Sequence, residues 1–170
     1  MRRWWVSFLS VLILVLALPV PGALAATWPT LTSGTRGTDV YALQSFLQVR
    51  GYSAPVDEIF GSSTTSAVTS FQSANGLVAD GIVGSGTWSK VVVTVQQGSS
   101  GQAVKALQRE LNRKHHYGLT EDGIFGAGTG SAVKSFQSAH GLSADGIVGP
   151  ATWQQLIGHF EDLGAASGTG

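Results

Sequence analysis

The sequence contains no cysteine among its 170 residues. This absence excludes disulfide bonds, thiolate metal sites and cysteine nucleophiles together. The chain must therefore fold around apolar cores that no covalent cross-link supports.

Charged residues are scarce, at 12% of the sequence. Without Arg2 and Arg3 at the N-terminus, eight basic residues stand against 10 acidic ones, a net charge of −2. Binding to nucleic acid requires several Lys or Arg side chains on neighbouring phosphates, and an anionic membrane attracts polybasic segments. We therefore expect neither nucleic acid nor a membrane as a partner of the processed chain.

Residues that hold metals are few, and their spacing does not match a metal site. The four histidines are His115, His116, His140 and His159. Zinc sites need three or four clustered ligands, and no spacing such as H-E-x-x-H occurs. We predict solvated loop histidines, no metal and no cofactor.

The residue groups typical of catalysis are missing as well. Glycosidases hold two carboxylates about 5–10 Å apart across a sugar, but Glu121 and Asp122 are neighbours in one turn. No G-x-S-x-G motif accompanies the many serines. The sequence therefore predicts that the chain is not an enzyme.

A long internal repeat is the main feature that is present. Residues 59–88 and 124–153 lie 65 positions apart and match at 22 of 30 positions, and the match continues upstream at a spacing of 64. Such self-similarity predicts two copies of one small module. Because a domain of about 60 residues buries only ~60% of its unfolded surface, we expect the two modules to pack against each other.

The two ends of the chain predict processing and disorder rather than folded structure. Arg2 and Arg3 precede an apolar stretch over residues 4–20, and Ala23-Leu24-Ala25 follows it, as in a secretory signal peptide. A retained membrane anchor is the alternative, although the stretch is short for a spanning helix of ~20 residues. We predict a signal peptide over 1–26, module 1 over 27–93, module 2 over 94–160 and a disordered tail over 161–170.

Each module is predicted to contain three short helices. Val40, Leu43 and Leu47 have the spacing of one buried helical stripe, and the second copy repeats it. The second and third helices are expected to bury aromatic residues: Phe71 and Trp88, with Phe136 and Trp153 in the second copy. Tyr41 is expected on an exposed helix face. The predicted fold class is all-α, two tandem three-helix modules with glycine-rich loops.

A shorter motif, Asp-x-Ile-x-Gly-x-x-Thr, occurs twice in each module. It begins at Asp57, Asp80, Asp122 and Asp145, and we call the four segments the Asp-x-Ile loops. The second residue is Gly in three copies, as a turn prefers, and Glu58 is the exception. The motif predicts a turn before a helix start, with the Ile and the next apolar residue inserted into the core.

These motifs together carry a family resemblance. G-x-x-V-x-x-L-Q, followed by D-G-I-F-G-x-x-T and D-G-I-V-G-x-x-T-W, resembles the bacterial peptidoglycan-binding domain of the three-helix type, over residues 33–92 and 97–157. In this family such modules usually accompany a catalytic domain that cuts the cell wall, and we expect no such domain in this chain. The resemblance implies a secreted, non-catalytic protein of the cell wall that binds peptidoglycan and targets or anchors a separate hydrolase.

Six residues are the candidate ligand contacts: Tyr52, Gln72 and Asp80, with their counterparts Tyr117, Gln137 and Asp145. Each tyrosine follows the first helix of its module, where its ring either stacks on a sugar or is partly buried. Each glutamine adjoins a buried stripe, where its amide either faces a ligand or ties a loop to the helix. The aspartates recur in turns at helix starts, which also explains them as capping residues.

Two function hypotheses follow. In the first, both modules bind peptidoglycan alike, and their connection by a linker around residues 93–96 raises the affinity through avidity. In the second, the modules form a protein-interaction unit that regulates a secreted hydrolase. Sedimentation with purified sacculi distinguishes the two.

Overall fold

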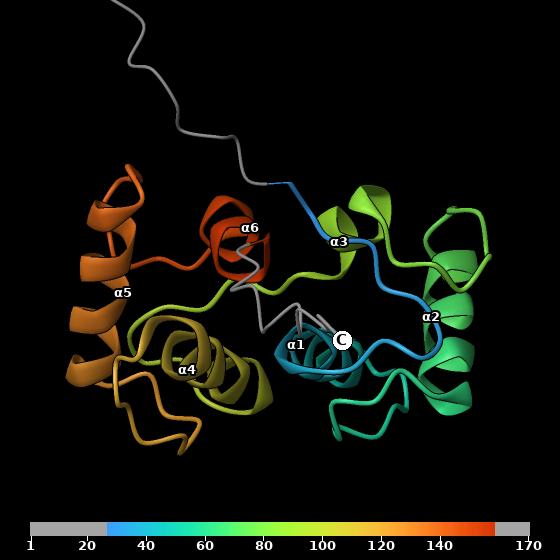
Figure 1. Cartoon of the computed structure of the whole chain (residues 1–170), viewed down its shortest axis with the longest axis horizontal. Helices are drawn as coiled ribbons and strands as arrows, with labels where there is room; N and C mark the ends of the chain where they lie inside the picture. Colours follow the sequence, from blue (N-terminus) through green and yellow to red (C-terminus); the bar gives the residue numbers. More distant parts are fainter. Residues whose placement is uncertain (1–26, 159–170) are drawn as a thin grey trace, which may run out of the picture.

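The computed structural model describes residues 27–158, and in this range the named elements are six α-helices (Figure 1). They are α1 (Thr38–Val49), α2 (Ser62–Ala74), α3 (Ser85–Val91), α4 (Gln102–His115), α5 (Ala127–Ala139) and α6 (Pro150–Gly158). The predicted all-α class with two three-helix modules is therefore confirmed. The predicted signal peptide and tail lie outside the described residues. Within residues 27–158, no helix combines the length and the apolar character that crossing a bilayer requires.

A buried tryptophan connects the last helix of each module to the segment that enters the module. Trp88 and Trp153 are both 0% exposed. The indole N–H of Trp88 donates to the carbonyl of Pro29 at 2.8 Å, and that of Trp153 donates to the carbonyl of Val93 at 2.8 Å. A buried indole needs such an acceptor. These bonds therefore fix the segment that leads into the first helix of each module against the core of that module.

Short β-bridges hold the Asp-x-Ile loops in place. Leu31 pairs with Val83 in module 1, and Val95 pairs with Val148 at the equivalent position in module 2. The remaining two loops pair in the same way, Arg36 with Ile59 and Ser100 with Ile124. Each Asp-x-Ile loop is thus fastened through backbone hydrogen bonds to the chain that leads into the first helix of its module.

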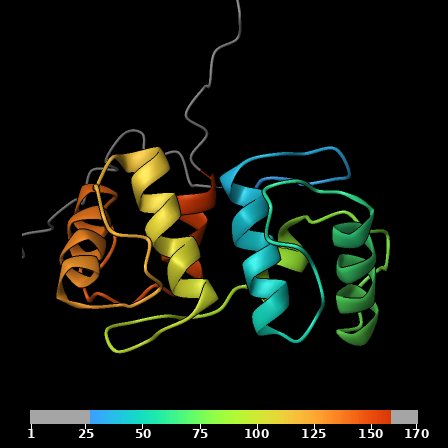
Figure 2. The same ribbon diagram turned by 90° about the horizontal axis from the view of Figure 1, so that it is seen from below.

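The two modules pack through α1 and α4, which lie side by side at the centre of the molecule (Figure 2). Every residue from Val40 to Leu47 is buried. A helix that is covered on all sides needs neighbours on two faces, and α4 covers the face of α1 that its own module leaves open. The ring of Phe46 meets that of Trp153 edge-on, with centroids 4.8 Å apart. The expected packing between modules is confirmed.

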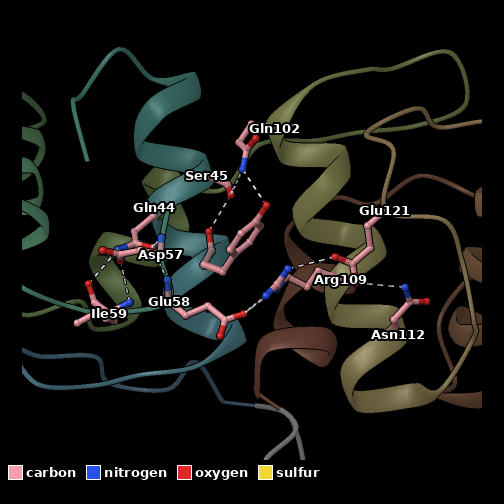
Figure 3. Close-up of polar contacts among 10 residues, drawn as sticks. Gln44, Ser45, Asp57, Glu58, Ile59, Gln102, Arg109, Asn112 and Glu121 are labelled. Atoms are coloured by element: carbon pink, nitrogen blue, oxygen red, sulfur yellow. Dashed lines mark hydrogen bonds and ion pairs between the residues drawn. The ribbon is translucent and has the colours of Figure 1, made fainter. Parts of the chain in front are cut away.

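Tyr41 lies in this interface and is only 7% exposed, so the expectation of an exposed position is wrong. The guanidinium of Arg109 lies 4.5 Å from the centre of its ring. Gln102 Nε2 donates to the Tyr41 hydroxyl at 3.1 Å and lies 3.3 Å from Ser45 Oγ (Figure 3). A pattern within one module cannot show which of its faces the other module covers.

One lysine joins three elements at the edge of the interface. Lys114 forms an ion pair with Asp39 and lies 3.3 Å from the carboxylate of Glu110. It also donates to the carbonyls of Leu156 at 3.1 Å and Ile157 at 3.2 Å. Glu110 is 1% exposed, and burial raises its pKa to about 8. The interface therefore contains a buried carboxyl group whose pKa lies well above its ordinary value.

Candidate ligand-binding site

A buried glutamine holds each Asp-x-Ile loop in shape. Gln137 Nε2 lies 2.9 Å from Asp145 Oδ1, 2.9 Å from the Ile147 carbonyl and 3.2 Å from Thr152 Oγ1. Its Oε1 accepts the N–H of Gly146 at 2.9 Å. The other three loops have the same arrangement: Gln44 with Asp57, Gln72 with Asp80, and Gln108 with Asp122.

The sequence-predicted residues Gln72 and Gln137 therefore lie beneath the loops rather than on the surface. Each is 1% exposed. Of the two interpretations, the geometry bears out the one in which the amide ties a loop to the helix. Because a buried amide needs all of its partners, these side chains fix the position of Asp80 and Asp145.

Asp80 and Asp145 present exposed carboxylates with lowered pKa values. The N–H of Ile147 donates to Asp145 Oδ1 at 2.8 Å, and this bond, the Gln137 bond and the nearby charge of Lys134 lower the pKa of Asp145. The equivalent bonds from Ile82 and Gln72 lower the pKa of Asp80. In each aspartate, the backbone N–H and the glutamine amide both donate to Oδ1.

Glu58 keeps the turn geometry that its three counterparts reach with glycine. Its φ is 65°, against 72° at Gly81, 73° at Gly123 and 77° at Gly146. A left-handed backbone costs a non-glycine residue roughly 1–2 kcal/mol. The Glu58 carboxylate accepts from Arg109 Nε at 2.7 Å across the module interface (Figure 3). The exception to the motif is thus an interface residue.

The isoleucines of the Asp-x-Ile loops are exposed, so the expectation that they insert into the core is wrong. The exposed fraction is 37% for Ile59, 43% for Ile82, 60% for Ile124 and 41% for Ile147. The residue after each isoleucine is buried as expected, because alternate residues of the bridged segment point to opposite sides. Each loop therefore places an apolar side chain on the surface, two residues after a fixed carboxylate.

The two candidate tyrosines are half-buried. Tyr52 packs edge-on against Phe71, with ring centroids 5.4 Å apart. Burial also raises the pKa of the Tyr117 hydroxyl. The structure thus places Tyr52 against the core of α2 and leaves part of each ring at the surface.

A groove lies beside one of these loops in module 2. Its volume is about 230 Å³. It is lined by Gln96, Gln97, Phe125, Gly130, Lys134, Asp145, Gly146 and Ile147. The sequence had indicated Asp145 alone among these as a ligand contact. Four of the missed residues differ between the two copies of the repeat, so a search for shared positions passes over them.

The sequence predicts that the histidines are solvated loop residues. Two of them lie in an aromatic cluster instead. The ring of His140 stacks on Phe136 at 4.0 Å, and His115 meets Phe136 at 4.7 Å and His140 at 5.3 Å. In the part of the chain that the structure describes, no group of three or more His, Cys, Asp or Glu residues is arranged to hold a metal ion. His159 lies outside that part.

Comparison with protein families identifies both modules. The family model described as "Putative peptidoglycan binding domain" matches residues 36–91 and 100–156. The chain belongs to the peptidoglycan-binding domain family. The two matches contain nearly all of α1–α3 and α4–α6 respectively.

The relatives of these peptidoglycan-binding modules include cell-wall enzymes. The zinc D-Ala-D-Ala carboxypeptidase of Streptomyces albus G is 49% identical over 72 residues, which cover 41% of this chain and 27% of that protein. A probable N-acetylmuramoyl-L-alanine amidase of Bacillus licheniformis is 32% identical over 157 residues, which cover 75% of this chain and 44% of the amidase. The chain thus spans less than half of the length of either enzyme.

Parts of two solved structures are similar to parts of the chain. The SleB N-terminal domain is 40% identical, with 38% of this chain and 89% of that chain covered and a TM-score of 0.37. The Burkholderia AP3 phage endolysin is 33% identical, with 64% of this chain and 38% of that chain covered and a TM-score of 0.38. In module 2, Gln96 and Gln97 precede the matched range of residues 100–156. Two of the four polar side chains that line the groove therefore come from the segment that leads into α4.

Proposed function

We propose that this protein is exported, binds cell-wall peptidoglycan through its module pair and does not itself cut the wall. The observation that carries the proposal is the pair of peptidoglycan-binding modules over residues 36–91 and 100–156. The groove of module 2 supports it, since a shallow site with amides, charges and an apolar floor suits a polymer of sugars and amino acids.

The carboxyl groups support a role without catalysis. A general acid needs a pKa near the working pH and a position beside the substrate. The exposed aspartates of the loops have lowered pKa values and are held by internal hydrogen bonds. Glu110, whose pKa is raised to about 8, is 1% exposed and lies in the module interface rather than in the groove.

The relatives support a role in bringing an enzyme to the wall. In the amidase and the carboxypeptidase, the matched part is 44% and 27% of the protein, so most of each enzyme lies outside the modules. We propose that the present module pair targets or anchors a separate wall hydrolase in the same way. Such a role requires export to the cell wall, for which the predicted signal peptide over 1–26 is the sequence support.

Incubation of the processed protein with purified sacculi tests the proposal. After centrifugation, we expect the protein in the pellet and no fall in turbidity over hours. A fall in turbidity would show that the chain is a hydrolase. Protein that stays in the supernatant would instead favour the alternative, a unit that binds and regulates an enzyme.

A further inference from the structure

Half of the residues that line the groove of module 2 differ between the two modules. Phe125, Asp145, Gly146 and Ile147 have identical counterparts in module 1. The other four lining residues do not: Gln96, Gln97, Gly130 and Lys134 correspond to Thr32, Ser33, Thr65 and Thr69. Four of the positions at which the modules differ therefore lie together, beside the second Asp-x-Ile loop of module 2.

Gly130 leaves room that a side chain would occupy. A Cβ atom at this position would lie 3.7 Å from Phe125 Cε1 and 3.9 Å from Gln97 Oε1, between the aromatic floor and the amide wall of the groove. These are ordinary van der Waals distances, so position 130 tolerates a side chain. Its absence opens the groove.

Two threonines fill the corresponding space in module 1. A Cβ atom built on Gly81 would lie 3.0 Å from Thr65 Cγ2 and 3.3 Å from Thr69 Oγ1. The hydroxyls of these threonines donate to their own helix, Thr65 to the Gly61 carbonyl at 3.1 Å and Thr69 to the Thr65 carbonyl at 2.9 Å. Module 1 therefore presents methyl groups and already bonded hydroxyls where module 2 presents a groove.

Lys134 brings a positive charge to the groove opposite a carboxylate. A Cβ atom built on Gly146 would lie 3.0 Å from Lys134 Cε and 3.6 Å from its Cγ, so the lysine stem crosses the loop beside Asp145. Both charged side chains are exposed. Lys134, Asp145, Gln96 and Gln97 thus line the same groove as the apolar side chains of Phe125 and Ile147.

We infer that the groove of module 2 recognises a charged amino-acid segment of the stem peptide, and that module 1 lacks this specificity. A carboxylate of the ligand would accept hydrogen bonds from Lys134 and Gln97, and an ammonium or amide N–H would donate to Asp145. Neutral glycan offers hydroxyl and N-acetyl groups, which bring no opposite charge to Lys134 or to Asp145. This inference rests on the proposed binding of peptidoglycan. It replaces equal binding by the two modules with recognition of the stem peptide by module 2 alone.

Titration calorimetry with two soluble wall fragments tests the inference on the full processed chain. One fragment is a disaccharide that carries a stem tetrapeptide with free carboxylates, and the other is the same disaccharide without the peptide. We expect the parent protein to bind the peptide-bearing fragment at least about tenfold more tightly, the effect of one charge-assisted hydrogen bond.

The variants exchange groove residues between the modules. G130T places the residue of module 1 into the groove, and K134T removes the charge; each should weaken binding of the peptide-bearing fragment about tenfold. Threonine has a higher helix propensity than glycine, so G130T should keep the fold, and K134T changes an exposed side chain. T65V in module 1 is the matched control and should leave the affinity unchanged. The fourfold variant T32Q/S33Q/T65G/T69K, which gives module 1 all four differing groove residues, should add a second binding site.

The outcomes separate the failure of this inference from that of the proposed function. If the parent sediments with sacculi and binds both fragments equally, or if G130T and K134T bind as the parent does, the inference is overturned while peptidoglycan binding stands. If the parent binds neither fragment and does not sediment, the proposed function fails, and this inference fails with it.

Discussion

Gln137 makes four polar contacts with one Asp-x-Ile loop, and these contacts make it a residue that positions the loop. Its amide joins the carboxylate of Asp145, two backbone groups and the hydroxyl of Thr152 from a position that is 1% exposed. The shape of the exposed loop surface therefore depends on a buried residue beneath it. The candidate site on each module is a fixed carboxylate and an exposed isoleucine above a buried amide.

Replacement of this glutamine should destabilise module 2. Q137L leaves the N–H of Gly146 and the Ile147 carbonyl without their partner, at a cost of about 1–3 kcal/mol for each buried group. The measurement is the free energy of unfolding in urea. Q96A, at an exposed position of the same groove, is the matched control and should change it by less than about 0.5 kcal/mol. Equal stability of Q137L and the parent would refute the positioning role.

The helices show that periodicity within one module predicts burial against that module but not burial against the other module. The stripe of Val40, Leu43 and Leu47 predicted a helix that the structure confirms as α1, because burial against the same module follows the helical repeat. Tyr41 was misplaced because its cover comes from α4, where its contact Gln102 lies 61 positions further along the chain. The loop isoleucines were misplaced because a turn with a β-bridge alternates sides.

The candidate site was predicted only in part for a related reason. Repetition pointed to Asp80 and Asp145, since both copies of the module need the same turn. The groove residues Gly130 and Lys134 are the positions where the copies differ. Only the fold brings them beside Asp145, so the sequence alone gave no reason to group them.

Truncation of a side chain between α1 and α6 should weaken both modules at once. Phe46 is 0% exposed and meets Trp153 of the other module. We expect F46A to lose about 3–5 kcal/mol of stability, as for other buried phenylalanines, and to unfold in a single transition. V49A is the matched control on α1, since Val49 is 49% exposed. Thermal unfolding in two separate steps would contradict the coupling of the modules.

At the scale of the whole molecule, the two modules pack into one unit and are not independent domains joined by a flexible linker. The segment around residues 93–96 is itself part of the fold. The Val93 carbonyl accepts a hydrogen bond from the Trp153 indole N–H, and Val95 forms a β-bridge with Val148. Gln96 lines the groove. The modules therefore have a fixed orientation toward each other. Any gain from having two modules depends on the match between that orientation and the wall polymer.

The buried carboxyl in the interface predicts a dependence of stability on pH. The pKa of Glu110 is raised to about 8 from 4.5, so between these values the folded protein holds a proton that the unfolded chain releases. The free energy of unfolding should therefore fall as the pH rises from about 4.5 to about 8. The raised pKa of Asp39 adds to this trend at its lower end.

Urea unfolding at pH 5 and pH 8 measures this dependence. E110Q keeps the shape of a protonated carboxyl and should remove most of the decline. E121Q changes a carboxylate that is only partly buried, and should retain the decline. Stability of the parent that is the same at both pH values, or an undiminished decline in E110Q, would refute the assignment.

The most direct test of the central claim is a sedimentation isotherm of the processed protein with purified sacculi, recorded for the parent and for I147S. Ile147 is 41% exposed and lines the groove, so its replacement should leave the melting temperature unchanged. We predict saturable binding of the parent and binding of I147S that is weaker by about tenfold. A parent protein that stays in the supernatant, or an I147S isotherm that coincides with the parent's, would contradict the claim that this surface binds peptidoglycan.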